Sequence, residues 1–146
     1  MISACGFSPV YTKQNSANLT GKISIQEPNT QNDFVFYSRL TDRFGEASGK
    51  YILNYAITTT KEDKAINFDG TVHRVEISAS VSFNLKNTES GVQIFSDKEE
   101  MYLSYSNFGS TAAVLNAERT TSKQLVILLT DKVADRISLL LVDQDS

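Results

Sequence analysis

Alternating apolar and polar residues predict a β-sheet that is buried on one face. The clearest alternation runs through residues 73–85, where every second residue from Val75 to Leu85 is apolar and the residues between them, from Arg74 to Asn84, are polar. A period of two places the two sets on opposite faces, so one face is expected to pack on a core and the other to meet water. Shorter alternations predict three further strands, at residues 19–26, 51–60 and 92–105, the last broken or irregular around residues 97–100.

A first helix is predicted between the strands at 19–26 and 51–60. Thr30 is followed three residues later by Asp33, which resembles a capping box with Asp in place of the usual Glu. Gly45 is placed to end the helix, because glycine readily takes the left-handed conformation found there. The predicted buried stripe consists of Phe34, Tyr37, Leu40, Thr41 and Phe44.

A second, longer helix is predicted from Ser110 or Thr111 to about Val142. A break near Thr120-Thr121 is the alternative, because two consecutive β-branched residues weaken a helix. Without a break, a rise of about 1.5 Å per residue allows the helix to cross the whole sheet. Its predicted apolar face consists of Val114, Ala117, Thr121, Leu125, Leu128, Leu129, Val133, Ile137 and Leu140.

The predicted element order is β-α-β-β-β-α, with turns at residues 68–71 and 87–91. This order, with two amphipathic helices and a sheet apolar on one face, predicts an α+β fold. We expect a two-layer sandwich in which about four mostly antiparallel strands carry both helices on one face. Residues 8–18 are polar and show no period, so residues 1–18 are interpreted as an anchor and tether and residues 19–146 as a single domain.

Composition narrows the possible functions. The chain has 146 residues, of which 40% are hydrophobic, enough for one domain with a proper core. Its net charge of −3 argues against a protein that binds nucleic acid through counter-charge. No run of about 18 apolar residues occurs, so no membrane-spanning helix is expected.

The cysteine near the start of the chain is the strongest local signal. Cys5 follows Ile2 and two small residues, Ser3 and Ala4, which is the pattern of a bacterial lipoprotein at its signal-peptidase cut. A signal peptide is expected to precede such a cut, and its charged and apolar regions do not stand before Cys5 in this sequence. Two or three acyl chains on Cys5 would anchor the domain stably at a membrane surface. The alternative is a lone thiol with no such role.

Enzyme and metal signatures are weak. One His and one Cys cannot supply the three or four ligands of a zinc site, so no metal is expected. Cys5 and His73 could form a nucleophile and base pair, but lipidation would consume the thiol. We therefore expect neither a catalytic residue nor a cofactor, and a hydrolase that uses His73 is the least favoured alternative.

Three cations are candidates for contact with an anionic lipid headgroup. Lys64, Arg74 and Arg119 could meet phosphate groups, which Arg and Lys recognise through charge-assisted hydrogen bonds. The alternative is that these are ordinary solvated charges. In the same way, the row of Ser78, Ser80 and Ser82 is either a wet surface or a hydrogen-bonding docking surface.

The segment CGFSPVY at residues 5–11, the element order and the closing segments at 117–119, 128–129 and 134–137 together resemble the lipopolysaccharide-assembly lipoprotein LptE family in its alphaproteobacterial form. The resemblance implies anchoring by lipidated Cys5 at the periplasmic face of the outer membrane. It also implies that the protein is no enzyme, plugs and helps to assemble the LptD β-barrel, and binds lipopolysaccharide during its delivery to the cell surface.

The family's lipopolysaccharide contacts are basic residues near the hairpin between the second and third strands and near the start of the last helix. Here those places hold Asp69-Gly70 and Val114-Leu115, with Lys64, Arg74 and Arg119 only nearby. The plug contacts are expected from the polar sheet face and the hairpin tips, because a barrel interior is wet and polar. The alternative is an auxiliary lipoprotein or ligand-binding module of an envelope transporter, with a ligand cavity inside the core.

Overall fold

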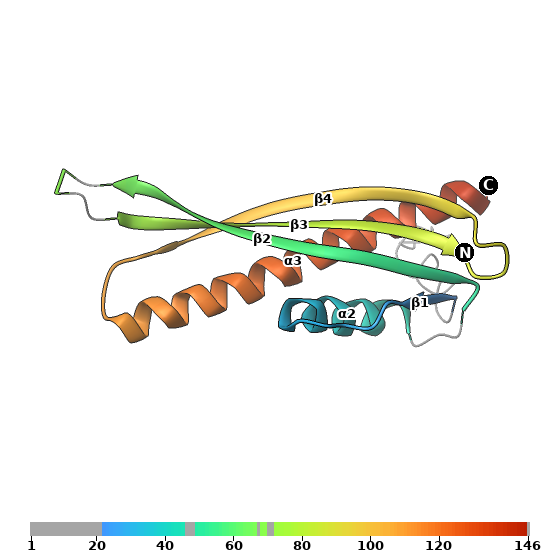
Figure 1. Ribbon diagram of the computed structural model, residues 1–146, viewed down its shortest axis with the longest axis horizontal. Coiled ribbons are helices and arrows are strands. Elements are labelled where there is room, and N and C mark those ends of the chain that lie inside the picture. Colours follow the sequence, from blue (N-terminus) through green and yellow to red (C-terminus); the bar gives the residue numbers. More distant parts are fainter. Residues whose placement is uncertain (1–21, 46–48, 67, 70–71, 146) are drawn as a thin grey trace, which may run out of the picture.

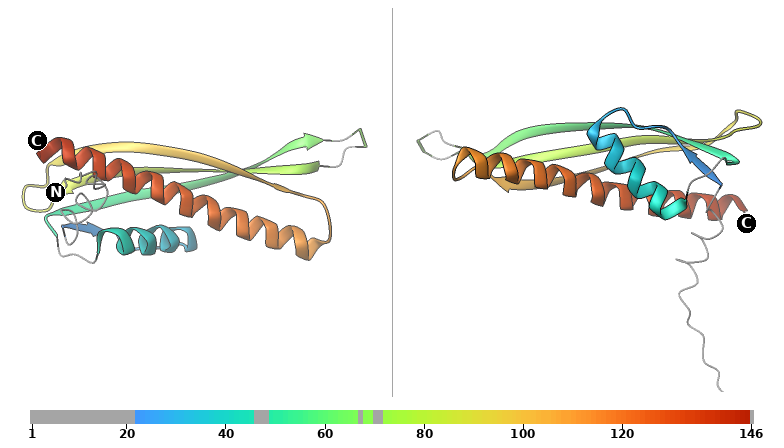
Figure 2. Two further views of the ribbon diagram at one scale, coloured as in Figure 1. Left: turned by 180° about the vertical axis from the view of Figure 1, so that it is seen from behind. Right: turned by 90° about the horizontal axis from the view of Figure 1, so that it is seen from below.

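The computed structural model describes residues 22–45, 49–66, 68–69 and 72–145, with side chains left out at residues 65–66, 72–73 and 142–145. Its elements are β1 (Ile23–Ile25), α2 (Gln31–Phe44), β2 (Tyr51–Ile66), β3 (Val72–Asn87), β4 (Gln93–Ser106) and α3 (Thr111–Asp145). The strand order is β1-β2-β3-β4, with β1 parallel to β2 and the other neighbours antiparallel. Both helices lie on one face of the sheet (Figures 1 and 2). The predicted α+β two-layer sandwich is therefore confirmed.

β1 is shorter than the strand predicted at residues 19–26, of which residues 19–21 lie outside the described part. Beyond Ile25, Gln26 donates its backbone N–H to the Leu53 carbonyl at 3.0 Å, and its side-chain Oε1 accepts the Tyr55 N–H at 3.3 Å. The chain then leaves the sheet and enters α2. The parallel pairing follows from this connection, because a crossover through a helix returns the chain in its original direction.

α2 begins and ends where the sequence predicted. The Asp33 N–H donates to Thr30 Oγ1 at 3.0 Å, and Asp33 Oδ2 accepts the Thr30 N–H at 3.2 Å, which completes the capping box. Gly45 ends the helix with φ of 78°. The predicted stripe was wrong at its first position, because Phe34 is 61% exposed and Phe36 is fully buried instead. The centroids of the Phe36 and Tyr55 rings are 4.5 Å apart, so Phe36 lies on the side of α2 that packs on the sheet.

The strand predicted at residues 92–105 is continuous, and the expected break around residues 97–100 is wrong. Those four residues pair without interruption with residues 80–83 of β3. Asp97 and Glu99 lie on the face that the helices cover, where Arg136 and Lys132 of α3 balance their charges. Ion pairs with a helix therefore allow four consecutive charged residues to continue a strand.

α3 runs unbroken through Thr120-Thr121, so the alternative of two helices is wrong. Its 35 residues correspond to a length of about 52 Å. The predicted apolar face is only partly correct, since Leu128 remains 36% exposed. The fully or almost fully buried residues of α3 are Leu125, Val126, Leu129, Thr130, Val133, Ala134, Ile137, Ser138 and Leu141. The buried face is rotated because both the sheet and α2 pack on this helix.

Candidate functional site

The sheet face opposite the helices is covered by no element that the structure describes (Figure 2), and we refer to it as the open face. It carries the side chains that alternate with the buried ones on the three long strands. They include Asn54, Ala56, Thr58, Thr60 and Glu62 of β2, Arg74, Glu76, Ser78, Ser80, Ser82 and Asn84 of β3, and Ser96, Lys98, Glu100, Tyr102 and Ser104 of β4.

The part of the open face that β2 and β3 form is uncharged at its centre, and beside it on β4 Lys98 and Glu100 form an ion pair at 3.0 Å. Along β2 from residue 54 to 60 and along β3 from residue 78 to 84, its side chains belong only to Asn, Ala, Ser and Thr. The Asn54 Nδ2 group donates to Asn84 Oδ1 across the two strands at 3.3 Å. The surface can therefore offer hydroxyl and amide groups to a partner without the large cost of desolvating a charge.

Two shallow depressions lie on the open face. One, of ≈ 590 Å³, lies between Asn54, Ala56, Ser82, Asn84, Ser96 and Lys98. The other, of ≈ 380 Å³, lies between Thr58, Thr60, Ser78, Ser80, Glu100 and Tyr102. Tyr102 is 64% exposed, which gives the second depression an aromatic side chain that a partner can cover. Both are features of the open face and not of the core between sheet and helices.

Charges gather at the hairpin end of the open face, beside the β2–β3 connection. The Lys64 ammonium lies 3.2 Å from a Glu62 carboxylate oxygen and 3.9 Å from a Glu76 carboxylate oxygen. The hydrogen bond with Glu62, followed by the negative charges of Glu62 and Glu76, raises the pKa of Lys64. Lys64 therefore stays charged but is already matched by two carboxylates.

The other sequence-predicted residues differ in their surroundings. Arg74 is exposed on the open face, and Arg119 is exposed on α3, on the opposite side of the sheet. Neither makes an ion pair with a residue in the described part of the chain. Cys5 lies outside the described residues, and so does the side chain of His73. The three cations belong to the same end of the molecule, but the sheet separates Arg119 from the other two.

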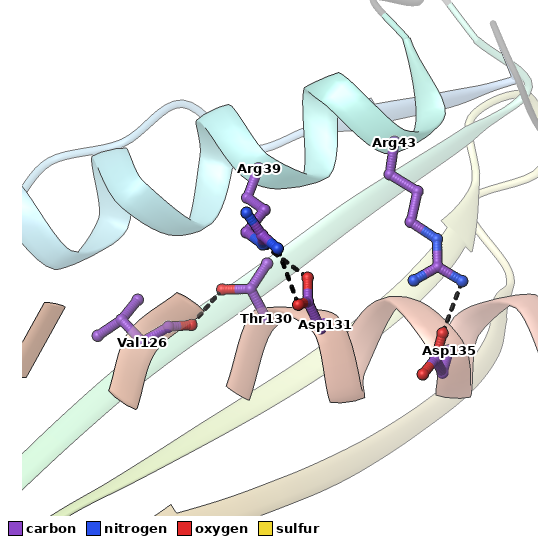
Figure 3. Close-up of polar contacts among 6 residues, drawn as sticks. All are labelled: Arg39, Arg43, Val126, Thr130, Asp131 and Asp135. Atoms are coloured by element: carbon purple, nitrogen blue, oxygen red, sulfur yellow. Dashed lines mark hydrogen bonds and ion pairs between the residues drawn. The ribbon is translucent and has the colours of Figure 1, made fainter. Parts of the chain in front are cut away.

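The opposite sheet face is closed by ion pairs between α2 and α3. Arg39 donates from Nε and Nη2 to the two carboxylate oxygens of Asp131 at 2.7 and 2.9 Å, and Arg43 Nη2 lies 2.6 Å from Asp135 Oδ1 (Figure 3). The two arginines are four residues apart on α2, and the two aspartates are four residues apart on α3. The two helices therefore run side by side in the same direction. Thr130 is buried on the side of α3 near Arg39 and donates its hydroxyl to the Val126 carbonyl.

The same stretch of α3 is tied to β4. Lys132 Nζ lies 3.1 Å from Glu99 Oε2, and Arg136 Nε lies 2.7 Å from Asp97 Oδ2. Four helical residues span about 6 Å and two strand residues span about 6.6 Å, so the two pairs match in spacing. These contacts fix both helices to one face and leave the other face open.

Tyr55 is an ionisable residue of the core that was not singled out from the sequence. Tyr55 is only 6% exposed, and its hydroxyl has no hydrogen-bond partner among the described residues. Burial, followed by the nearby negative charge of Asp33, raises the pKa of Tyr55 to about 12. The alternation of residues 51–57 placed Tyr55 on the buried face, but the missing partner could only be found in three dimensions.

The serine row of β3 was predicted from the sequence as a possible docking surface, but the rest of the open face was not. Thr58 and Thr60 of β2 and Ser96 of β4 extend the hydroxyl surface on both sides. The predicted antiparallel strand order could have indicated this larger surface, since paired strands place alternate residues on a common face. The extent of the open face depends on the register between β2, β3 and β4, which was not predicted from the sequence.

Two classes of site are absent from the part of the chain that the structure describes. Neither described helix combines the length and hydropathy needed to cross a membrane. No cluster of three or more His, Cys, Asp and Glu side chains within the described ranges could hold a metal ion.

Comparison with known proteins gives structural likeness without sequence likeness. No protein-family model and no curated protein matches the chain. A protein described as a lipoprotein from Caulobacter crescentus superposes with a TM-score of 0.70 at 14% identity, over 90% of this chain and 97% of that one. Rare lipoprotein B from Shewanella oneidensis gives 0.68 at 14% identity, over 86% and 98%. A minor lipoprotein from Acinetobacter baumannii gives 0.65 at 16% identity, over 82% and 91%. The chain therefore shares the fold of bacterial lipoproteins.

Proposed function

We propose that this protein is a lipid-anchored protein of the outer membrane that plugs and helps to assemble the LptD β-barrel and takes part in delivering lipopolysaccharide to the cell surface. The observation that carries the proposal is the fold shared with rare lipoprotein B and the other lipoproteins over most of the chain. The LptE-like opening at residues 5–11 agrees with it.

The open face is the surface proposed to meet the barrel. The interior of a large barrel is polar, and a polar wall needs a partner that can exchange hydrogen bonds with it. The uncharged Ser, Thr and Asn side chains of the open face are suited to this role, because pairing them costs less desolvation than pairing charges. The helices on the opposite face supply the rigid support.

The anchor is proposed to be Cys5. Two or three acyl chains there would hold the domain at the membrane, and the tether at residues 8–18 would let it reach the barrel. The lipopolysaccharide contacts are proposed to be Arg74 and Arg119 first, with Lys64 weaker because Glu62 and Glu76 already balance its charge.

The test is co-purification from detergent-solubilised outer membranes. The protein, expressed from its natural gene with a C-terminal affinity tag, is expected to bring a large β-barrel with it in about a one-to-one ratio, the stoichiometry of a plug. A Cys5→Ser variant should be released from the membrane fraction and lose incorporation of labelled palmitate.

Recovery of the protein alone would contradict the plug function. Recovery with inner-membrane transporter subunits would indicate the auxiliary lipoprotein instead. Retention of labelled acyl chains on the Cys5→Ser variant would show that the anchor lies elsewhere.

A further inference from the structure

Among the described residues, no strand pairs with one edge of β2 along half of its length. β1 pairs only with residues 51–53 of β2, through the register from Ile23 with Tyr51 to Ile25 with Leu53. Tyr55 is the last β2 residue whose edge-directed N–H has a partner within the described ranges, the side chain of Gln26. Beyond it, β2 continues to Ile66, paired on its other side with β3. Figure 1 shows this half of β2 extending past both β1 and α2.

The alternation of an antiparallel ladder identifies the free groups. The odd-numbered residues Tyr51, Leu53 and Tyr55 direct their N–H or C=O groups towards β1, whereas the even-numbered Lys50 accepts from Thr88 at the other edge. Register between β2 and β3 is unbroken until Asp63. The N–H and C=O groups of Ile57, Thr59, Lys61 and Asp63 therefore all point out of the free edge.

This row of backbone groups is accessible. Residues 58–64 are exposed, and no described residue pairs with the four free positions on this side. The edge of β4 differs, because Lys132 Nζ donates to the Glu100 carbonyl and four consecutive charged residues line that strand. Charged side chains and capped carbonyls discourage strand pairing. On β2, four charged residues at 61–64 follow residues 57–60, Ile-Thr-Thr-Thr, which are uncharged, so strand pairing is expected to begin at residues 57–60.

The chemistry of the row specifies its partner. Paired donors and acceptors that repeat every second residue match the backbone of another extended chain. The regular ladder ends at the bulge after Asp63, and the first free position is Ile57. An added strand would therefore span residues 57–63.

We propose that residues 57–63 of β2 pair with an extended segment of the barrel protein, which adds a strand to this edge of the sheet. The inference rests on the proposed plug function, and it locates part of the contact in backbone hydrogen bonds. The segment lies outside the closed barrel wall, because the strands of a closed barrel have no free edge to offer.

A proline substitution separates this role from side-chain contacts. Thr59→Pro removes an N–H that points out of the free edge and leaves the β2–β3 ladder intact, a position where edge strands tolerate proline. Thr59→Ala is the matched control, because it changes the side chain and keeps the N–H. Both variants are carried through the outer-membrane co-purification, and their folding is checked by thermal unfolding of the purified protein. Hydrogen exchange is measured for the wild type alone and in complex.

Thr59→Ala is expected to recover the barrel as the wild type does, and Thr59→Pro roughly tenfold less, since one lost hydrogen bond leaves a partner carbonyl unsatisfied. The amides of Ile57, Thr59 and Lys61 should exchange rapidly in the free protein and slowly in the complex.

Equal recovery with a folded Thr59→Pro variant would overturn the inference and leave the plug function standing. Slow exchange in the free protein would also overturn it, because a second copy or the chain itself would then cover the edge. Failure of the wild type to recover any barrel would overturn the plug function and this inference together.

Discussion

Arg136 of α3 donates from Nε to Asp97 Oδ2 of β4 at 2.7 Å, on the sheet face that the helices cover. One helical turn earlier, Lys132 makes the equivalent contact with Glu99, and on the other side of α3 Asp131 and Asp135 meet the arginines of α2. Four residues within positions 131–136 of α3 thus bind a strand on one side and a helix on the other. The ion pairs neutralise Asp97 and Glu99 on the covered face and so allow β4 to remain a regular strand there.

Asp97→Asn is expected to lower the free energy of unfolding by less than about 1 kcal/mol at neutral pH, because the ion pair is partly exposed. The hydrogen bond from Arg136, followed by that from the Lys98 N–H, lowers the pKa of Asp97. A lowered pKa stabilises the fold above the unfolded-state value, near 3.9, and the effect is lost as pH falls through the lower folded value.

Urea unfolding from pH 8 to pH 3 tests this. The difference between wild type and Asp97→Asn should be constant down to about pH 5 and shrink below about pH 4. Glu89→Gln, in the exposed turn after β3, should show no such difference. A gap that persists unchanged at pH 3 would contradict the assigned charge pair.

Tyr55→Phe is expected to stabilise the fold by about 1 kcal/mol, because it removes a buried hydroxyl that has no partner among the described residues. Because burial raises the pKa of Tyr55 to about 12, the wild type keeps its full stability below about pH 10. It loses stability as the pH rises from there towards the pKa of Tyr55 in the folded protein. Thermal unfolding and an alkaline absorbance titration measure the two effects. A lower melting temperature for Tyr55→Phe would indicate that the hydroxyl makes a contact, such as one to a buried water.

Gly49→Ala is expected to destabilise the fold by about 1–3 kcal/mol, because an added Cβ would lie 2.1 Å from the Lys22 carbonyl oxygen. That carbonyl accepts the Tyr51 N–H at 2.9 Å, so relief of the clash displaces β1. Gly91→Ala is the comparison, with open space around its Cβ and only the cost of φ of 71°. Urea unfolding should give a larger loss for Gly49→Ala, and equal losses would remove the packing argument.

Ser82→Arg is expected to reduce recovery of the barrel roughly tenfold without changing stability, because it places a long charged side chain among the uncharged residues of β2 and β3, next to Lys98. Gln124→Arg makes the same charge change on the exposed side of α3 and should leave recovery unchanged. Co-purification with thermal unfolding as a folding check decides between them. If Ser82→Arg binds normally, the open face is not the barrel contact.

Arg74→Ala and Arg119→Ala are each expected to weaken lipopolysaccharide binding roughly tenfold, the typical loss of a charge-assisted hydrogen bond. Lys64→Ala should change binding by less than about twofold, since Glu62 and Glu76 already engage that ammonium. Binding of purified variants to labelled lipopolysaccharide at fixed salt measures this. An effect of Lys64→Ala as large as the other two would reverse the proposed ranking.

The sequence alone determined those features that depend on neighbours along the chain. Period-two alternation from Val75 to Leu85 predicted the buried face of β3, and Thr30 with Asp33 predicted the start of α2. The element order then predicted the two-layer architecture, because amphipathic elements must cover a common apolar face.

Only the tertiary structure decided how these elements meet. It buried Phe36 in place of Phe34, kept β4 regular through Asp97 and Glu99, and left one edge of β2 from Ile57 onwards without a partner strand in the described part of the chain. Each outcome depends on contacts between residues distant in sequence, such as the 39-residue separation of Asp97 and Arg136. Local periodicity says which side of an element is apolar, whereas the position of each partner decides which residues it covers and which face it leaves open.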